Sequence, residues 1–583
     1  MVHGWRVFGM RFLWNERGGM LPFTLIVMGV VILMGALAVN MVRVEHRRSV
    51  TQSVLDICIL NAAAQRQTLP PRTVLDDCLD KHGFQATIAD FDAQTGRTKS
   101  VTASAQTSLE SFFLNRVETY DVGVSSSAAE ALTNLEIILA LDISASLLSP
   151  GGGSTMPFLD LKAAAKQFVA TMLAEDTQGR VQITLLPYNS QVNLGADLAA
   201  KFNVSNAPQN LMIGTTQIGP DVTQMRCLEL PASSFGTTTI SRTQPIEASP
   251  FVDSLGTTSQ SLTYVAPNNA SFAVAQLQNN NCSFFRTAPA GSTANVVRLP
   301  DFTAAGQQST VDTVQKRILA LQNRIDGLFS TGETSINLGM RWALAILDPD
   351  MRPVFAEFSA AGRMSQMAAN FPMDFNAPTG IKVVVLMSDG TNRTETRMPS
   401  HLARGPSPFW IGNDGNMSWF NAARSGTAKY WVPHNATWQA TPWRNATNSG
   451  AAARQMDYEE VWRRMKVTYV AWHFHARSVS QASGSTNNTA RQTAYLAALN
   501  TYLPAATTVT DATKDAQLTQ ACNLAREKGI YVYSLLFVTA TTNSPTLAAC
   551  ATVPAMSYTA TLAELQAAFA AIALHISRLQ LNE

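Results

Sequence analysis

A run of twenty residues without a charged side chain, Met20 to Val39, lies between Arg17 and Arg43 near the start of the chain. As a helix it is long enough to cross a bilayer core of about 30 Å. Residues 41–65 contain no glycine or proline, so the helix is expected to continue beyond the apolar run. We therefore predict a transmembrane helix over residues 19–42.

A cleaved signal peptide is the competing interpretation of the same segment. Ala36-Leu37-Ala38 has the small-x-small form of a processing site. The apolar run exceeds the usual 7–15 residues of a signal peptide, which favours a retained anchor. Three arginines precede the segment and three follow it, so the positive charges do not decide its orientation.

The six cysteines all follow the apolar segment. They form three couples that are neighbours in sequence: Cys58 with Cys78, Cys227 with Cys282, and Cys522 with Cys550. Six cysteines permit 15 pairings, and pairing of neighbours closes the shortest loops. Three such disulfides would place the large C-terminal part in an oxidising compartment, whereas six buried thiols are the alternative.

Composition narrows the class of protein. A chain of 583 residues exceeds one ordinary core, so it has several folding units or one domain with large insertions. Only 14% of the residues are charged, which is well below the average of soluble domains. The net charge of +2 offers no electrostatic attraction for nucleic acid. The polar, weakly charged sequence is typical of an envelope or secreted protein.

The chain after the apolar helix divides into two regions. Residues 43–133 are predicted to form a juxtamembrane helix, a small hairpin or sheet over 84–125, and the linker "SSSAAEALTN". Residues 134–583 alternate apolar strands with amphipathic helices, which predicts an α/β domain with a doubly wound, mostly parallel sheet. Two stretches interrupt that pattern, a Thr/Asn-rich one at 190–310 and a Trp-rich one at 391–467. Both are interpreted as insertions, or alternatively as separate small domains.

Oxygen-bearing side chains follow two of the apolar strands. Asp142, Ser144 and Ser146 come at the end of "LEIILALD", and Asp389 ends "IKVVVLMSD". Thr334 lies between them in the sequence, in a loop that opens a helix. In an open parallel sheet, ligands bind beyond the carboxyl ends of the strands, so these five side chains can converge there. Hydroxyls and carboxylates without imidazole or thiolate suit a hard cation such as Mg²⁺, with Mn²⁺ and Ca²⁺ as alternatives.

This pattern resembles the metal-ion-dependent adhesion site of von Willebrand factor A domains. Asp142-Ile-Ser144-Ala-Ser146, then Thr334, then Asp389-Gly390 match the order of that motif. The resemblance implies a Rossmann-like sheet on which the hydroxyls bind the cation directly, the aspartates act directly or through water, and a carboxylate of a partner protein completes the coordination. The alternative is that Ser144, Ser146 and Thr334 only cap helices and close turns.

The wider chain resembles the TadG-like proteins of bacterial Tad/Flp pilus systems. The likeness rests on the anchor "RGGMLPFTLIVMGVVILMGALAVNMVRV", on "SINLGMRWALAILDP", and on the closing strand, cysteine loop and helix from "CNLAREKGIYVYSLLFV" onward. The two insertions do not match it. The resemblance implies a single-pass inner-membrane protein with residues 1–18 in the cytoplasm and the large domain in the periplasm.

Other candidate sites are weaker. His473 and His475 in "VAWHFHAR" would face one side of a strand as two metal ligands, but no third ligand accompanies them. The tryptophans of residues 391–467 could form a binding platform, although such residues more often form a small core. The sequence contains no G-x-S-x-G, G-x-x-x-x-G-K-[ST] or H-E-x-x-H motif.

Three functions therefore remain for the structure to address. The first is a membrane-anchored, non-enzymatic component of pilus assembly or anchoring that binds a protein partner in the cell envelope through the cation, with no nucleic-acid partner. The second is a secreted or surface-exposed adhesin. The third is an envelope hydrolase that uses the cation for catalysis.

Overall fold

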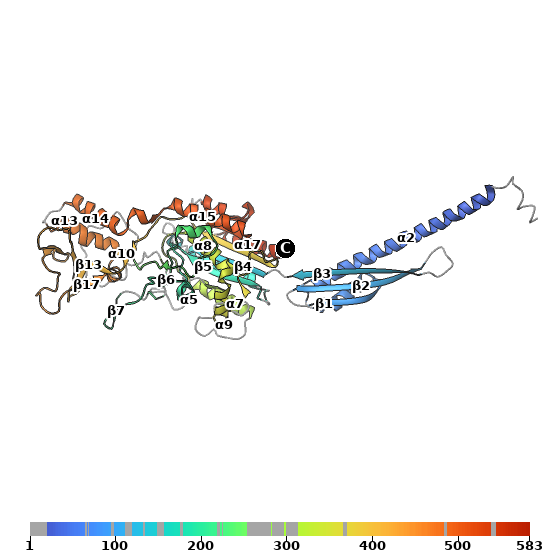
Figure 1. Cartoon of the computed structure of the whole chain (residues 1–583), viewed down its shortest axis with the longest axis horizontal. Coiled ribbons are helices and arrows are strands. Elements are labelled where there is room, and N and C mark those ends of the chain that lie inside the picture. Colours follow the sequence, from blue (N-terminus) through green and yellow to red (C-terminus); the bar gives the residue numbers. More distant parts are fainter. Residues whose placement is uncertain are drawn as a thin grey trace, which may run out of the picture. The chain divides into compact units, whose positions relative to one another are not determined.

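The computed structural model describes most of the chain in two compact units, Met1–Leu132 and Thr133–Glu583, which are treated separately (Figure 1). The described residues are 20–64, 67, 69–94, 98–110, 119–131, 134–148, 157–174, 176, 179–218, 222–223, 225–252, 282, 297–298, 313–364, 370–482, 487–537, 544–561 and 563–582. The N-terminal segment 1–18, expected in the cytoplasm, and most of residues 253–312 lie outside them.

The first unit contains one long helix, one short helix and a three-stranded antiparallel sheet of order β1-β2-β3. Its elements are α2 (Met20–Ala63), α3 (Pro71–Lys81), β1 (Thr87–Gln94), β2 (Thr98–Glu110) and β3 (Thr119–Ala131). The Cys58–Cys78 disulfide joins the two helices. Leu55, Ile59 and Leu75 pack with Val101 and Val124 in the core of this unit.

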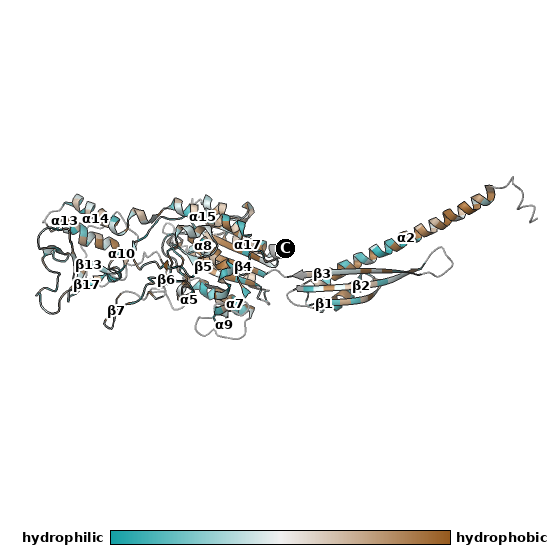
Figure 2. Cartoon of the chain, viewed as in Figure 1, coloured by the Kyte–Doolittle hydropathy of each residue, from teal (hydrophilic) through white to brown (hydrophobic). Residues whose placement is uncertain are grey.

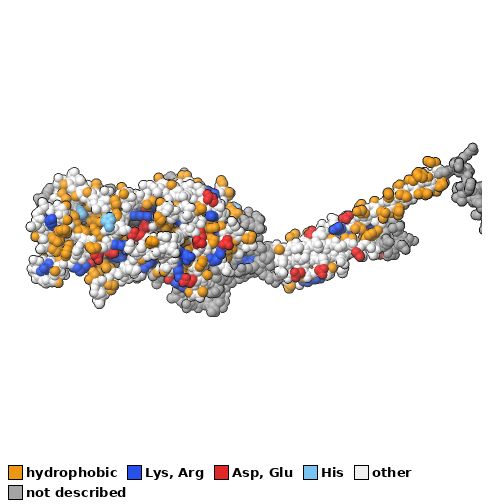
Figure 3. Space-filling model, viewed as in Figure 1, with side chains coloured by type: hydrophobic (Ala, Val, Ile, Leu, Met, Phe, Trp, Pro, Cys, Tyr) orange, Lys and Arg blue, Asp and Glu red, His pale blue; other side chains and the backbone are white. Residues whose placement is uncertain are grey.

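The first half of α2 is apolar and exposed. Met20, Leu25, Ile26, Val31 and most of their apolar neighbours up to Val42 are exposed among the described residues of the unit. Figure 2 shows this half in the hydrophobic colour, and Figure 3 shows its apolar side chains on the surface. The helix is long and apolar enough to cross a membrane, a criterion that a signal sequence near an N-terminus also meets.

The predicted linker "SSSAAEALTN" is wrong for most of its length, because β3 continues to Ala131. Every residue of β3 pairs with β2, from Thr119 opposite Glu110 to Ala131 opposite Thr98. The small side chains of Ser125–Ala131 have little intrinsic preference for a strand, and the prediction relied on that preference. Continuous pairing with a thirteen-residue neighbour overrides it.

The second unit is built on a six-stranded sheet of order β10-β5-β4-β11-β19-β20. Four neighbouring pairs are parallel and the edge strand β10 is antiparallel to β5. The strands are β4 (Asn134–Asp142), β5 (Val181–Tyr188), β10 (Val297–Arg298), β11 (Gly380–Ser388), β19 (Tyr531–Phe537) and β20 (Ser557–Ala560).

Helices cover both faces of this sheet, which explains why its strands are apolar on every side. Ile137 and Leu139 of β4 belong to one core, and Ile138 and Ala140 belong to the other. The first core also takes side chains from α4 (Pro157–Leu173), α7 (Val314–Asp326) and α17 (Leu565–Asn582). The second takes side chains from α8 (Ile336–Leu347) and α15 (Asp511–Glu527).

The remaining described sheets differ from the predicted parallel one. An antiparallel five-stranded sheet of order β16-β15-β14-β13-β17 lies between β11 and α15 in the sequence. Its elements and the helices that follow are β13 (Pro406–Ile411), β14 (Met417–Phe420), β15 (Tyr430–Val432), β16 (Thr437–Gln439), β17 (Arg454–Asp457), α11 (Tyr458–Arg464), α12 (Val467–Val470), π-helix η6 (Ala471–Ala476), α13 (Arg477–Ser480) and α14 (Asn488–Tyr502). These elements share a third core, so the Trp-rich part extends well beyond residue 467.

Short elements complete the description of the second unit. Three further sheets have two strands each: β12 (Glu395–Thr396) with β18 (Thr508–Val509), β6 (Val204–Ser205) with β9 (Ile246–Glu247), and β7 (Leu211–Ile213) with β8 (Thr216–Ile218). The remaining helices of four residues or more are η2 (Ala145–Leu148), α5 (Gly195–Ala199), η3 (Ala232–Gly236), α9 (Arg352–Ala360), α10 (Ser400–Ala403) and α16 (Pro545–Cys550). The chain is thus mixed α/β. Among the described sheets, the largest is mostly parallel, the two-stranded β6–β9 sheet is parallel, and the others are antiparallel.

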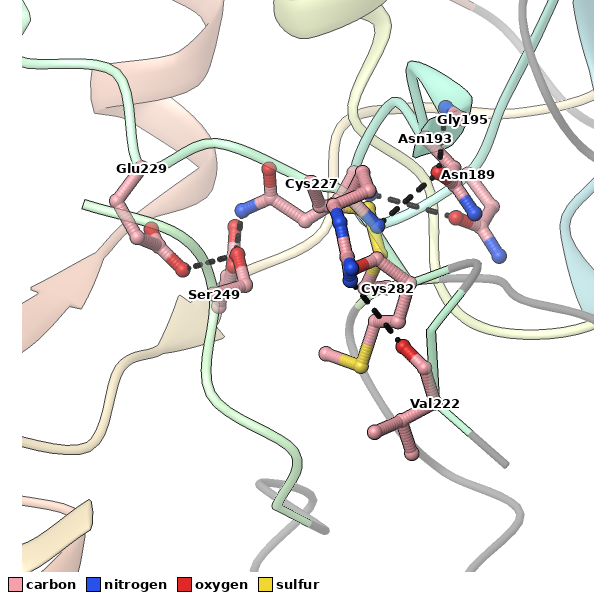
Figure 4. The surroundings of a disulfide bond; sticks show 12 residues. Asn189, Asn193, Gly195, Val222, Cys227, Glu229, Ser249 and Cys282 are labelled. Atoms are coloured by element: carbon pink, nitrogen blue, oxygen red, sulfur yellow. Dashed lines mark hydrogen bonds between the residues drawn. A yellow bond between two sulfur atoms is a disulfide. The ribbon is translucent and has the colours of Figure 1, made fainter. Parts of the chain in front are cut away.

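All six cysteines are paired as neighbours in sequence. Besides the bond in the first unit, Cys227 bonds to Cys282 and Cys522 bonds to Cys550. Figure 4 shows the Cys227–Cys282 bond among residues of the first insertion. There the Asn193 side chain accepts hydrogen bonds from the backbone N–H groups of Gly195 and Arg226 (2.9 and 3.2 Å). The predicted disulfides, which close the shortest loops, are confirmed.

Candidate metal centre

Two carboxylates lie at the same edge of the large sheet. Asp142 is the last residue of β4, and Asp389 directly follows Ser388, the last residue of β11. The two strands are parallel neighbours, with Leu141 opposite Met387. Their carboxyl ends therefore meet, which is where ligands of open α/β sheets bind.

The two serines connect these carboxylates. Ser144 lies just before the 3-10 helix η2, and its backbone N–H donates to Asp142 Oδ1 (2.8 Å). The hydroxyls of Ser144 and Ser146 are 2.9 Å apart. Ser146 Oγ in turn donates to Asp389 Oδ1 (3.0 Å), across a sequence separation of 243 residues. A continuous chain of polar contacts thus joins the ends of β4 and β11.

Thr334 reaches the same place from the loop before α8. With Ser144, Ser146 and Asp389 it lines a hollow of about 300 Å³. The other lining residues are Ala145, Gly332, Glu333, Gly390, Thr391 and Arg393. Asp142 is fully buried and lies beneath this hollow, one hydrogen bond from Ser144. The structure therefore brings together all five residues that the sequence singled out; we refer to them below as the rim site.

The carboxylates of the rim site are poorly solvated. Burial raises the pKa of Asp142 to about 7, and the nearby charge of Asp389 adds to that rise. Burial also raises the pKa of Asp389, against the hydrogen bond from Ser146. Asp389 Oδ2 is buried without a hydrogen-bond partner among the described residues. A positive charge would stabilise the ionised forms of these two crowded acidic groups.

The donor atoms fit a hard divalent cation. Every candidate ligand is a hydroxyl or carboxylate oxygen, which is the donor set that Mg²⁺, Mn²⁺ and Ca²⁺ prefer. The hollow is lined by no histidine, cysteine or lysine. Three hydroxyls and two carboxylates would leave room for water or for a ligand from outside, because Mg²⁺ takes six oxygens and retains some waters.

Sequence reasoning missed two residues that hold the site together. Ser388 Oγ donates to Asp142 Oδ2 (2.6 Å) and so orients that carboxylate. Asn392 connects the loop after Asp389 to the start of α8. Ser388 could have been suspected because it directly precedes Asp389 at the end of an apolar strand. Asn392 gave no such signal, since its partners are more than 50 residues away in the sequence.

The prediction that His473 and His475 lie on one side of a strand is wrong. Both are in the π-helix η6, where residues two apart point in different directions. The His473 ring contacts Arg477 Nη1 (3.3 Å), and His475 Nε2 contacts the Tyr502 hydroxyl (3.1 Å). The alternating apolar pattern arises because this helix is buried almost all round, not because it is a strand. Neither histidine is part of the rim site.

The two histidines predict a pH-dependent stability. Burial, and for His473 also the charge of Arg477, lowers their pKa values to about 3 (His473) and about 4 (His475). Below pH 6.5 the unfolded chain binds protons at these two histidines that the folded protein does not, so their contribution to stability falls as the pH drops toward 4. Together they should lower the free energy of unfolding by roughly 2 kcal/mol from pH 7 to pH 5.5, whereas the raised pKa of Asp142 acts in the opposite direction. Denaturant unfolding of the wild type and H475Q isolates one histidine: the pH-dependent loss should be about 1 kcal/mol smaller in H475Q, and an equal change in both proteins contradicts the assignment.

The tryptophans of the Trp-rich part mostly face its own core. Trp431 and Trp462 are fully buried and pack in the third core, together with Trp472. Trp410, Trp419, Trp438 and Trp443 are half-buried. Arg424 already stacks over Trp438, with its guanidinium carbon 4.1 Å from the ring centre. The main role of these tryptophans is therefore to form a hydrophobic core.

Comparison with known proteins yields structural likenesses alone. No family model matches the chain, and no curated protein matches it. It is similar to the vWF domain of the type V pili tip protein Mfa5 from Porphyromonas gingivalis (13% identity, 77% of this chain and 96% of that one, TM-score 0.28). It is also similar to the adhesive tip pilin GBS104 from Group B Streptococcus agalactiae (11% identity, 76% and 99%, TM-score 0.29). A third likeness is to the pilus adhesin SpaC from Lactobacillus rhamnosus GG (10% identity, TM-score 0.26), of which the chain covers 33%. With TM-scores below 0.3, these likenesses do not extend to individual site residues.

Proposed function

We propose that this chain is a membrane-anchored, non-enzymatic, protein-binding component of Tad/Flp-type pilus assembly or anchoring. In this proposal the large domain is a von Willebrand factor A domain that contacts its partner through a divalent cation at the rim site. One observation supports it above the others. Ser144, Ser146, Thr334 and Asp389 come from three separate segments and line one hollow, and Asp142 lies one hydrogen bond from Ser144. Among the described residues, Asp389 Oδ2 has no hydrogen-bond partner.

Each residue of the rim site would have a distinct part in holding the cation. Ser144, Ser146 and Thr334 line the hollow, and their hydroxyl oxygens would be neutral ligands. Asp389 lines it as well, while Asp142 supplies negative charge from beneath. When bound, the cation would offer a free coordination position to an outside oxygen. A carboxylate is the fitting ligand, because hard divalent cations prefer charged oxygen donors.

The charged residues at the hollow favour binding over catalysis. Glu333 and Arg393 lie beside the rim site, and the charge of Arg393 offsets a small part of the rise that burial causes in the pKa of Asp389. Among the described residues that line the hollow, there is no histidine or lysine that could activate a serine, and the Ser146 hydroxyl donates to Asp389. A partner would therefore meet a cation flanked by one acidic and one basic side chain, which suits recognition of a specific acidic residue.

The helix α2 supports the anchoring part of the proposal. Its apolar half is exposed along residues 20–42, and α2 continues without interruption into the core of the first unit. A retained helix would hold the protein in the inner membrane with the disulfide-bonded parts in the periplasm. Cleavage after Ala38 would instead release the protein and favour a secreted adhesin. Fractionation of cells with antibodies against both ends of the chain separates these outcomes.

Cation-dependent capture of the partner tests the proposed function. The full chain, purified from its own envelope in mild detergent without crosslinking, should retain envelope proteins in about 5 mM Mg²⁺, on the order of ten times an expected sub-millimolar Kd. The same proteins should be lost in EDTA. Equal retention under both conditions, or a wild-type chain that binds none of Mg²⁺, Mn²⁺ and Ca²⁺ by calorimetry, rejects the proposal.

A further inference from the structure

One polar side chain in the loop after Asp389 is buried although its neighbours are exposed. Asn392 is 1% exposed, whereas Thr391 and Arg393 on either side of it face solvent. A buried amide in an exposed loop needs partners for both its oxygen and its nitrogen. The partners of Asn392 lie on two helices that are distant in sequence.

The oxygen of Asn392 caps helix α8. Asn392 Oδ1 accepts hydrogen bonds from the backbone N–H groups of Ile336 (2.8 Å) and Asn337 (3.4 Å), the first residues of that helix. Ser335, which precedes α8, makes no capping bond with its own side chain. Its hydroxyl instead accepts from the buried Lys514 (2.6 Å). Asn392 therefore acts as the N-cap of α8, although it belongs to a different segment of the chain.

The nitrogen of Asn392 and the next residue complete the connection. Asn392 Nδ2 donates to Asp515 Oδ1 on α15 (2.8 Å). The backbone N–H of Arg393 donates to the carbonyl of Thr334 (2.9 Å). The loop that begins at Asp389 is thus bonded twice to the chain that leaves Thr334, once to the carbonyl of Thr334 and once to the N–H of Ile336, two residues later.

These bonds connect the two segments that carry Thr334 and Asp389; the loop around Thr334 is also bonded to Asn189 and Ser190. Thr334 follows Gly332, whose backbone has a φ of +78°, in a loop that has no regular structure of its own. Asp389 lies three residues before Asn392, directly after the rigid strand β11. Resting on the proposed function, we propose that Asn392 is a positioning residue that holds the Thr334 hydroxyl at the cation site opposite Asp389. Residues that orient the ligands of a metal, without touching the metal themselves, commonly change the affinity of the site for that metal.

If Asn392 served only to stabilise the fold, N392A would lower stability and leave the cation affinity unchanged. Loss of an N-cap costs about 1 kcal/mol of folding free energy wherever the helix lies. Asn487 is a matched control, because its side chain caps α14 by accepting from the N–H of Ala490 (3.0 Å) in the Trp-rich part of the chain. N392A should lower stability at least as much as N487A, because it also removes the bond to Asp515, and only N392A should weaken cation binding.

The test measures Mn²⁺ affinity of the full chain in detergent by calorimetry. We expect N392A to weaken binding about 10-fold and N487A to leave it unchanged. T334A should weaken binding, and the double variant N392A/T334A should be no weaker than T334A, because Asn392 acts through Thr334. The double variant N392D/D515N leaves the net charge unchanged. The side chain at position 392 can still accept from the N–H of Ile336, and it accepts a hydrogen bond from position 515 where it donated one before. The Mn²⁺ affinity of this variant should therefore lie within about threefold of the wild type.

Each other outcome overturns the inference. Equal Mn²⁺ affinity of N392A and the wild type, or losses that multiply in N392A/T334A, excludes positioning through Thr334 while leaving the proposed function intact. A wild-type chain that binds no Mn²⁺ removes the proposed function and the inference together. If N392A does not fold, N392Q replaces it, since the longer side chain moves the acceptor away from Ile336 while retaining the amide.

Discussion

Replacing Asp142 with alanine should lower the affinity for Mg²⁺ at least about 100-fold. Loss of a residue that only supports a metal ligand lowers the metal affinity about 10- to 100-fold. Asp142 in addition supplies one of the two negative charges of the rim site. Calorimetry on the full chain in detergent measures the loss. Thermal unfolding provides a second readout: a saturating cation stabilises the wild type, by about 2.7 kcal/mol at 100 times its Kd, and should not stabilise the variant.

Two variants make this result specific. D142N retains an acceptor for the N–H of Ser144 and is therefore expected to fold, yet it lacks the charge and should also fail to bind Mg²⁺. D374A is the control, because Asp374 is an exposed carboxylate that pairs with Arg352 (2.8 Å) away from the rim site. Mg²⁺ binding by D142A or D142N with wild-type affinity contradicts the site assignment.

Replacing Lys382 with methionine should destabilise the protein by about 3–5 kcal/mol, because it leaves a buried carboxylate without its counter-charge. Lys382 and Glu136 are opposite each other on the neighbouring strands β11 and β4. Their side chains are 4% and 1% exposed, and Nζ lies 3.0 Å from Oε1. Lys382 also donates to the carbonyl of Leu347 (2.9 Å), at the end of α8. Denaturant unfolding measures the change.

The double variant E136Q/K382M separates charge from packing. With both charges gone, the neutral amide still offers an oxygen to the N–H of Met373, which now donates to Glu136 Oε1 (2.6 Å). The double variant should therefore recover most of the lost stability. A loss below about 1 kcal/mol in K382M, or no recovery in the double variant, means that the pair is not an effective buried ion pair.

Much of the rim site could be predicted because its parts obey local rules. Unbroken apolar strands that end in Asp142 and Asp389 indicate buried parallel strands, and parallel neighbours bring their carboxyl ends together. Ser144 and Ser146 follow within four residues and could go nowhere else. Thr334 came from the order of a known motif, not from local pattern. Its place at the hollow agrees with that motif, while the bound cation stays a prediction.

The sequence-based predictions were wrong where contacts with residues distant in sequence override the structure that the local pattern favours. Ser125–Ala131 reads as a linker because its residues are small and polar, but pairing with β2 makes it a strand. His473 and His475 alternate with apolar residues as a strand would, but burial on nearly all sides of η6 produces that alternation. In both cases the energy that decides the structure comes from contacts, not from intrinsic preference.

The sequence by itself determined a long apolar helix near the start, alternating strands and helices in the larger part, and neighbouring cysteine pairs. Those features follow from burial periodicity and from loop lengths, which are local properties of a chain. Only the tertiary structure decided that Ser388 orients Asp142 and that Asn392 caps α8 from another segment. Hydrogen bonds between residues 50 to 250 positions apart form only after the sheet and its helices have packed, so no local pattern encodes them.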